Sequence, residues 1–131
     1  LQWRLNAPKT TYQVVSVWRN DELVALSFVR ETILKDVPTL AILDVMVLKD
    51  SPGALATLHH EMERYARTRQ IETLSVMASS STSSRLSLSR YGFLRTPFVF
   101  KLIVKLLTAS TELPFDCPSA WDLMWMDSDD L

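Results

Sequence analysis

The stretch that decides the fold reads Leu40-Ala41-Ile42-Leu43-Asp44-Val45-Met46-Val47-Leu48, followed by Lys49-Asp50-Ser51-Pro52-Gly53. Its first part is almost continuously apolar, which is typical of a strand covered on both faces of a sheet. Ser51 then offers a capping hydroxyl and Pro52 suits the first position of a helix. The sequence therefore predicts a central strand that leads directly into a helix.

Downstream of this junction the pattern continues as helix, strand and a second short helix. Apolar residues at helical spacing predict a helix of about four turns that must pack through its apolar stripe: Leu55, Leu58, Met62, Tyr65 and Ala66. Residues 71–77 follow as a strand, so the two strands form a parallel pair with a right-handed crossover. A polar serine loop at residues 78–84 leads into a short helix near residues 85–91, which Gly92 can end.

Upstream, residues 12–18 and 23–29 are β-rich runs joined by a short polar connection, which predicts a hairpin. Towards the C-terminus, residues 98–107 and 121–126 have strand character, and residues 127–131 are expected to fray. The predicted order is β-β-β-α-β-α-β-β, and we interpret residues 1–131 as a single α/β domain.

Bulk composition excludes several classes of protein. Of the 131 residues, 47% are hydrophobic and 22% are charged, which is ordinary for a globular chain. The 14 Lys and Arg residues balance 15 Asp and Glu residues, so no overall field draws the chain to nucleic acid. No apolar run is long enough to span a membrane. Cys117 is the single cysteine and excludes an internal disulfide, and the default location is cytoplasmic.

The order of elements, together with the motifs inside it, resembles the GNAT (N-acetyltransferase) superfamily over residues 12–107. The motifs are Asn20-Asp21-Glu22-Leu23-Val24-Ala25 at the hairpin, Gly53-Ala54-Leu55 at the helix start, and Arg90-Tyr91-Gly92-Phe93 followed by Thr96-Pro97. The resemblance implies a mixed, mostly antiparallel sheet with a parallel central pair, flanked by helices. Trp3-Arg4 and Trp121-Asp122-Leu123 also resemble the C-terminal half of tandem GNAT-like proteins, some of which are associated with cell-envelope polysaccharide synthesis.

That resemblance also implies missing parts. The first strand and the first two helices of the GNAT fold, which shape the acceptor pocket in the family, have no counterpart in these residues. Because the chain begins at Leu1 without an initiator methionine, we interpret it as a piece of a longer protein. A possible partner is therefore an upstream GNAT-like domain.

The resemblance further implies a site for acetyl-CoA or another acyl-CoA. In the family, pantetheine lies along the central strand, and this role falls on Val45, Met46, Val47 and Leu48 here. A pyrophosphate would lie at the helix N-terminus. The candidate loop, residues 49–54, includes Ser51, Gly53 and Ala54, and Ser79 follows the parallel strand. The alternative to ligand binding is that residues 45–48 form an ordinary buried strand and residues 49–54 an ordinary capped helix start.

Catalytic groups are less complete than the binding elements. Asp44 is the ionisable residue within the central strand and is the candidate general base, with a hydrogen-bonded structural aspartate as the alternative. The family's acid, a tyrosine four residues before the glycine, is replaced by Leu88, and we interpret Tyr91 as a core residue. The phosphate loop retains only Gly53 of the family's two spaced glycines, and Pro52 and Asp50 weaken it.

Metal sites are not expected. His59 and His60 are adjacent on the predicted helix, so they point about 100° apart and are interpreted as surface residues. The run Asp127-Ser128-Asp129 lacks the glycine and glutamate of a calcium loop.

Two functions follow from the sequence. The first is an acyl-CoA-dependent N-acyltransferase acting on an amine acceptor, and the second is a catalytically silent GNAT-like domain that supports a larger enzyme. The sequence does not identify the acceptor, the acyl group, the oligomeric state or the pathway.

Overall fold

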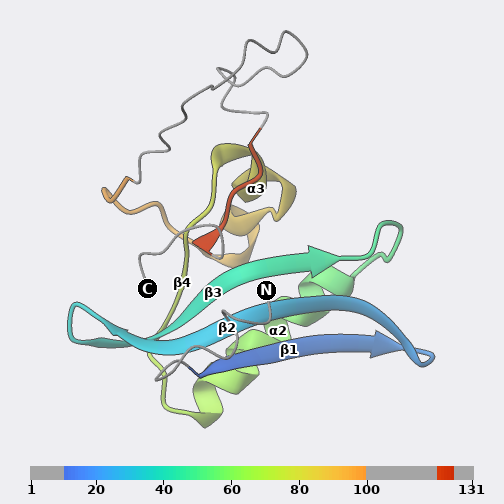
Figure 1. Ribbon diagram of the computed structural model, residues 1–131, viewed down its shortest axis with the longest axis horizontal. Helices are drawn as coiled ribbons and strands as arrows, with labels where there is room; N and C mark the ends of the chain where they lie inside the picture. The colour runs from blue at the N-terminus through green and yellow to red at the C-terminus, as the bar shows by residue number, and fades with distance from the viewer. Residues whose placement is uncertain (1–10, 100–120, 126–131) are drawn as a thin grey trace, which may run out of the picture. The chain divides into compact units, whose positions relative to one another are not determined.

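The computed structural model describes residues 11–99 and 121–125 of the chain (Figure 1). The chain divides into two compact units, one made of residues 1–77 and 124–131 and the other of residues 78–123.

The first unit is built on a sheet of four strands in the order β1-β2-β3-β4. These are β1 (Tyr12–Arg19), β2 (Glu22–Leu34), β3 (Val37–Val47) and β4 (Thr73–Val76). β1, β2 and β3 pair antiparallel in chain order, and β3 and β4 pair parallel. The predicted hairpin, the central strand and the parallel pair are therefore confirmed.

Both hairpins close through two residues in the left-handed region. Asn20 and Asp21 have φ values of 49° and 64°, and Lys35 and Asp36 have φ values of 48° and 67°. Two positive φ values in succession are the geometry of the tight turn that matches strand twist, and Asn and Asp tolerate it best. The first turn was expected from its residues. The second was not, because Lys is unusual at such a position.

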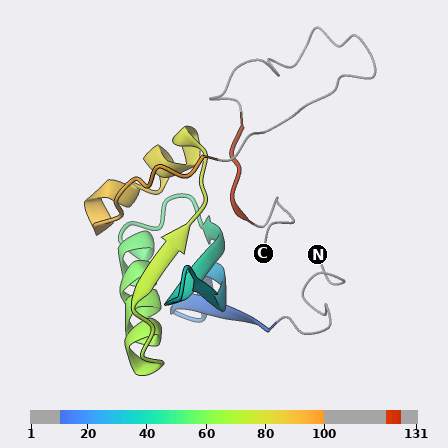
Figure 2. The same ribbon diagram turned by 90° about the vertical axis from the view of Figure 1, so that its left-hand side faces the viewer.

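Helix α2 (Ala54–Thr68) packs against one face of the sheet (Figure 2). The predicted apolar stripe is confirmed in its fully buried members Leu58, Met62 and Ala66. The predicted start is wrong, because the N-cap residue is Gly53 with φ 78° and no side chain caps the helix. Glycine adopts this left-handed conformation without the steric cost of a Cβ atom, so the backbone turn replaces the capping hydroxyl of Ser51.

A smaller apolar cluster lies around Ala41, Leu43 and Trp125, all of them buried. Partly buried hydrophobic residues pack against it: Tyr12, Phe28, Leu34 and Met77. Trp125 was expected in a strand at residues 121–126. Within the described residues 121–125, only an isolated bridge forms, at Met124, so that prediction is wrong. The segment thus contributes the buried side chain of Trp125 to this cluster and does not add a hydrogen-bonded strand to the sheet.

The second unit contains the helix α3 (Ser80–Arg85) and the 3-10 helix η1 (Leu88–Tyr91). The prediction of a serine loop at residues 78–84 is wrong, because most of these residues are helical. Ser79 explains the helix: its hydroxyl accepts a hydrogen bond from the N–H of Thr82 and caps the first turn. Gly92 ends η1 with φ 81°, as expected.

Some predictions fall outside the described residues. They include Cys117, the acidic run at residues 127–129 and most of the strand expected at 98–107, of which Phe98 and Val99 are described and are not in a strand. The order of described elements thus agrees with the first six predicted ones.

Candidate functional site

The strand segment expected to form the site lies on the part of β3 that continues beyond its pairing with β4. The parallel pairing runs from Thr39 opposite Thr73 to Ile42 opposite Val76 and then stops, while β3 continues to Val47. β4 ends at Val76, its last paired residue, whereas the arrow of β3 continues (Figure 1). Residues 44–47 are therefore paired only with β2 among the described strands, and one backbone edge of this segment has no described strand beside it.

A β-bulge marks the same point on the other side of β3. Phe28 pairs with Asp44 but Val29 pairs with Ile42, so Leu43 is an extra residue on β3. A bulge bends its strand and increases the local twist. The bulge lies one residue after the last β4 pair, so the part of β3 that continues beyond β4 begins at the bulge.

The direction of each backbone group on this segment follows from one hydrogen bond. The N–H of Leu48 donates to the carbonyl of Val24 on β2 at 2.9 Å. Because backbone groups alternate along a strand, Met46 also points towards β2, and Val45 and Val47 point to the edge without a neighbour. The four residues predicted to lie along pantetheine thus divide into two that face the open edge and two that do not.

Asp44 is half-buried and lies beside the bulge. Its Oδ1 accepts the N–H of Val45 at 2.7 Å, and its carbonyl accepts the hydroxyl of the buried Ser27 at 2.8 Å. The carboxylate therefore already satisfies one of the two N–H groups on the open edge. Val47 retains the other, and the role of Asp44 as a base stays a prediction.

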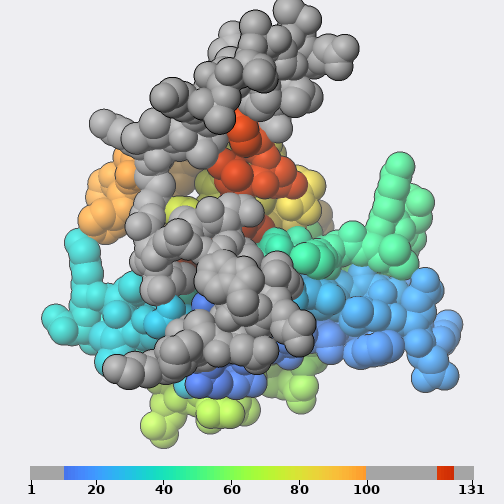
Figure 3. Space-filling model, in the orientation of Figure 1, coloured from blue at the N-terminus to red at the C-terminus, as the bar shows by residue number. Residues whose placement is uncertain are grey.

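The loop at residues 49–54 projects from the surface at the end of β3, green at the right of Figure 3. The N–H of Ser51 donates to the carbonyl of Leu48 at 3.3 Å, and the N–H of Ala54 donates to Ser51 at 3.2 Å. Ala54 is fully buried, so it packs the helix start and has no free donor for a ligand. The residues before it are exposed apart from Ser51.

The first turn of α2 still has donors to offer. The N–H of Thr57 bonds to the carbonyl of Gly53 at 3.0 Å, but the N–H groups of Leu55 and Ala56 find no hydrogen-bond acceptor among the described residues. Such orphan N–H groups and the helix dipole favour an anion at this end. The geometry of the predicted phosphate loop is thus compatible with anion binding.

One contact to this loop was not expected. Arg19, the last residue of β1, donates from Nη2 to the carbonyl of Pro52 at 3.0 Å. The two residues are 33 positions apart. No local pattern signals such a contact, which depends on the β1–β2 turn reaching the end of the sheet where α2 begins.

Ser79 belongs to the second unit, where its hydroxyl has several partners. It lies 2.8 Å from the hydroxyl oxygens of Ser81 and Thr82 and donates to the carbonyl of Trp121 at 2.8 Å. Thr82 also donates to Asp122, whose pKa is lowered by this bond and by Arg85 at 3.0 Å. The hydroxyl of Ser79 is thus part of a structural network, and its binding role stays a prediction.

Two further interpretations concern side chains near these elements. Leu88, which stands where the family has its acid, is buried within the second unit. His59 was interpreted as a surface residue, and this is wrong because it is 4% exposed. Burial lowers the pKa of His59, against a smaller opposing effect of Glu63. Its neighbour His60 is exposed.

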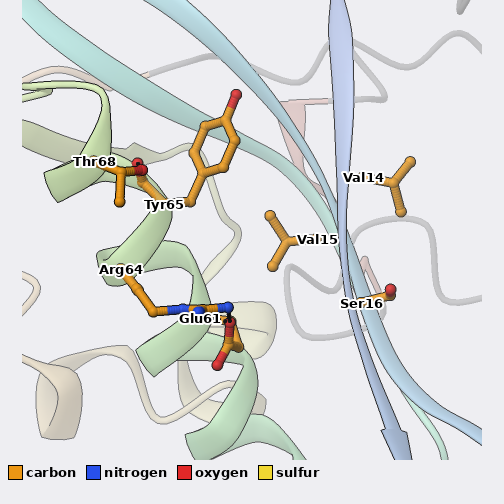
Figure 4. A pocket seen from close by; sticks show the side chains of 7 residues that line it. All are labelled: Val14, Val15, Ser16, Glu61, Arg64, Tyr65 and Thr68. Atoms are coloured by element: carbon orange, nitrogen blue, oxygen red, sulfur yellow. Dashed lines mark hydrogen bonds and ion pairs between the residues drawn. The ribbon is translucent and has the colours of Figure 1, made fainter.

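A separate groove of about 500 Å³ lies between α2 and the edge strand β1 (Figure 4). Val15 and Tyr65 point into it from opposite sides, while Val14 and Ser16 point away. Tyr65 donates to Glu31 Oε1 at 2.6 Å, and Arg69 lies 3.5 Å from the same oxygen. These contacts attach α2 to β2. None of the predicted site residues lines the groove.

Within the described residues, no group of three or more His, Cys, Asp or Glu side chains is placed to hold a metal ion. The described helices also include none with both the length and the apolar character needed to cross a bilayer.

Comparison with known proteins identifies the fold. No model of a known protein family matches the chain, and no curated protein is similar to it in sequence. Solved structures do match. An aminoglycoside acetyltransferase from an uncultured soil metagenomic sample is 17% identical with a TM-score of 0.60, over 78% of this chain and 71% of its own.

Two other acetyltransferases give similar values. A ribosomal-protein-alanine N-acetyltransferase from Brucella melitensis is 11% identical with a TM-score of 0.61, over 78% of this chain and 74% of its own. An aminoglycoside N-acetyltransferase in complex with CoA is 12% identical with a TM-score of 0.59, over 72% and 77%. The mixed sheet, the parallel β3–β4 pair and these matches together show that the chain has a GNAT-like fold.

Proposed function

We propose that the chain is an acyl-CoA-binding domain that transfers the acyl group to an amine. The observation that carries this proposal is the end of the β3–β4 pairing at Ile42, followed by five further residues of β3 with one open backbone edge. A chain with amide groups, such as pantetheine, can pair with that edge as an added strand does. The N–H of Val47 is the donor on this edge that Asp44 does not occupy.

The phosphate end of the ligand would lie at the start of α2. The N–H groups of Leu55 and Ala56 are the orphan donors there, and the left-handed turn at Gly53 brings the chain into the helix without a capping side chain. Acetyl-CoA is the probe of choice because one of the similar structures contains CoA. The identity of the natural acyl group belongs to the proposal.

The chemistry is a direct attack on the thioester. The amine nitrogen attacks the carbonyl carbon, a C–N bond forms, the C–S bond breaks, and CoA leaves as the thiolate. Asp44 or water accepts the proton that the amine loses. A backbone N–H on the open edge of β3 can support the carbonyl oxygen as charge develops on it.

The second candidate is a silent domain, and two observations favour it. Oδ1 of Asp44 is engaged with the N–H of Val45, and Leu88 offers no proton where the family has its acid. Acyl-CoA binding without transfer to any amine would fit this alternative, with catalysis assigned to an upstream domain. A cytoplasmic location stays a prediction for both candidates.

The first test is thermal unfolding with and without acetyl-CoA. A ligand at about 100 times its dissociation constant stabilises the folded state by about 2.7 kcal/mol, which raises the midpoint by several degrees. Absence of any shift at millimolar acetyl-CoA would contradict the binding proposal. Release of CoA thiol in the presence of amines then separates the enzyme from the silent domain.

A matched pair of variants locates the phosphates. Ala56 is exposed in the first turn of α2, so Ala56→Glu adds a negative charge at the positive end of the helix dipole. We expect this variant to unfold at a slightly higher temperature while it loses most of the shift that acetyl-CoA produces. Ala56→Gln is the neutral control and should keep the shift. Equal binding by both variants would place the phosphates elsewhere.

A further inference from the structure

The loop that precedes α2 has little positive charge of its own. Between β3 and the helix, Lys49 is offset by Asp50, and Pro52 has no N–H to donate. The helix start therefore offers backbone donors but no net side-chain charge from the loop. A ligand with several phosphate charges would need a cation from another element.

Among the residues that the structure describes, Arg19 supplies a positively charged side chain in contact with this loop. It ends β1, where it pairs with Glu22 across the turn, and its Nη2 donates to the carbonyl of Pro52 at 3.0 Å. Pro52 stands two residues before the first residue of α2. The guanidinium thus lies against the backbone that enters the helix.

This contact uses only part of the donor capacity of Arg19. A guanidinium carries five N–H groups in a planar fork, and its geometry matches phosphate oxygens better than that of an ammonium. The bond to Pro52 also restrains the side chain, so less conformational entropy is lost when an anion binds. With Lys49 and Asp50 offsetting each other, Arg19 gives the loop a net charge of about +1.

We propose that Arg19 binds the phosphates of acyl-CoA, supplying from β1 the positive charge that the loop before α2 lacks. The inference rests on the proposed function, because it assumes that the nucleotide end of the ligand lies at this helix start. It adds a specificity-determining residue from an element distant in sequence. The shared chemistry is a phosphate monoanion or dianion, which acyl-CoA carries both in its pyrophosphate and at its ribose 3′ position.

The test measures dissociation constants by calorimetry for Arg19→Gln, Arg19→Lys and the unchanged chain. The probes are acetyl-CoA, 3′-dephospho-acetyl-CoA and S-acetylpantetheine, which has no phosphodiester or nucleotide. We expect Arg19→Gln to weaken acetyl-CoA binding at least about tenfold, as loss of a charge-assisted hydrogen bond does. S-acetylpantetheine binding should not change. Arg19→Lys should recover part of the affinity because it restores the charge without the fork.

Binding of 3′-dephospho-acetyl-CoA distinguishes the two phosphate sources. If Arg19→Gln also weakens 3′-dephospho-acetyl-CoA, Arg19 binds the pyrophosphate, and if it does not, Arg19 binds the 3′-phosphate. Arg64→Gln is the control, because Arg64 is an exposed arginine on α2 that pairs with Glu61 away from the loop. This variant should bind all three probes as the unchanged chain does.

Several results would overturn the assignment. Equal weakening of acetyl-CoA and S-acetylpantetheine by Arg19→Gln would mean that Arg19 only shapes the loop. Unchanged binding of acetyl-CoA would mean that it has no part in the site. If the unchanged chain binds none of the probes, the proposed function itself fails and the role of Arg19 fails with it. Midpoints of unfolding without ligand, expected to differ by less than about 3 °C, confirm that the variants fold.

Discussion

The two halves of β3 have similar apolar sequences but different surroundings. Residues 39–42 pair with β2 and β4, whereas residues 44–47 pair with β2 alone among the described strands. Leu40 and Ile42 are at most 1% exposed, and Met46 is 46% exposed. One apolar run therefore has two surroundings: both halves contribute buried side chains, including Leu43 and Val45 in the second, but only the second half leaves one backbone edge without a described strand beside it.

Shortening one side chain in each half of β3 should give the largest difference in stability. We expect Leu40→Ala to lower the free energy of unfolding by about 2 to 5 kcal/mol, since it leaves a cavity in a fully buried site. Met46→Ala should cost less than about 1 kcal/mol because its side chain is half in solvent. Urea unfolding measures both. Similar losses for the two variants would show that the side chain of Met46 is as much a part of the core as that of Leu40.

Proline tests the backbone of the second half directly. Met46→Pro removes an N–H that points to β2 and leaves a carbonyl unpaired, so we expect a loss of about 2 kcal/mol or more. Val47→Pro removes an N–H on the open edge and should cost clearly less, while it reduces the thermal shift produced by acetyl-CoA. Thermal melts of both variants with and without the ligand give the comparison. The reverse order of stabilities would show that the backbone alternation is misassigned.

The pH dependence of stability tests the packing of α2, whose buried face carries His59. Burial lowers the pKa of His59 from 6.5, so between these two values the unfolded chain binds a proton that the folded chain resists. The free energy of unfolding should therefore fall as the pH falls below 6.5, by at most about 1.4 kcal/mol per pH unit for one group. Denaturant titrations at pH 7.5 and 5.5 measure the change. It should shrink in His59→Gln and persist in His60→Gln, which replaces an exposed residue.

The smallest expected effect concerns the outer surface of α2. Arg67 lies 4.0 Å from Glu63, and its side chain is 82% exposed. An exposed pair at this spacing contributes only about 0.3 to 0.5 kcal/mol, so Arg67→Ala should change the unfolding midpoint barely measurably. A loss above about 1 kcal/mol would show that the helix depends on more than its packed face.

Periodicity predicted most of the first unit because its elements are amphipathic or continuously apolar. The helix stripe at Leu58, Met62 and Ala66 is an example, since spacing alone places these residues on one face. His59 was missed because the buried arc of α2 is wider than the stripe of apolar residues. The helix propensity of histidine does not indicate that His59, which is adjacent to Leu58, lies within this buried arc.

Local conformation explains two other errors. The helix α3 is rich in serine, which seldom favours helix interiors, and it depends on the cap at Ser79 and on contacts with residues more than 40 positions away. The start of α2 depends on the positive φ of Gly53, whereas Ser51 and Pro52 carried the expected cap signal. In both places the sequence pattern reflects a local preference, and the folded structure adopts a different conformation from the one that this preference predicts.

The candidate site could be predicted only as a set of neighbouring residues in sequence. Which N–H groups of residues 45–48 face the open edge depends on the bulge at Leu43, and the contact of Arg19 depends on the turn at residues 20–21. Neither is a property of a short window of sequence. The strand register and the Arg19 contact come from the folded structure, and the sequence motifs do not contain them.

The parallel pairing of β3 with β4 also has a kinetic consequence. The two hairpins join strands that are adjacent along the chain, but Thr39 and Thr73, whose hydroxyls are 2.9 Å apart, must meet across 34 residues. Closing so long a loop is slower than closing a two-residue turn, so we expect β1, β2 and β3 to assemble before β4 docks. In the native state, the amides of β4 should then exchange with solvent through partial openings that leave the hairpins intact. The strand beside the proposed ligand edge would thus be the last to arrive and the first to leave, and a bound acyl-CoA would slow its departure.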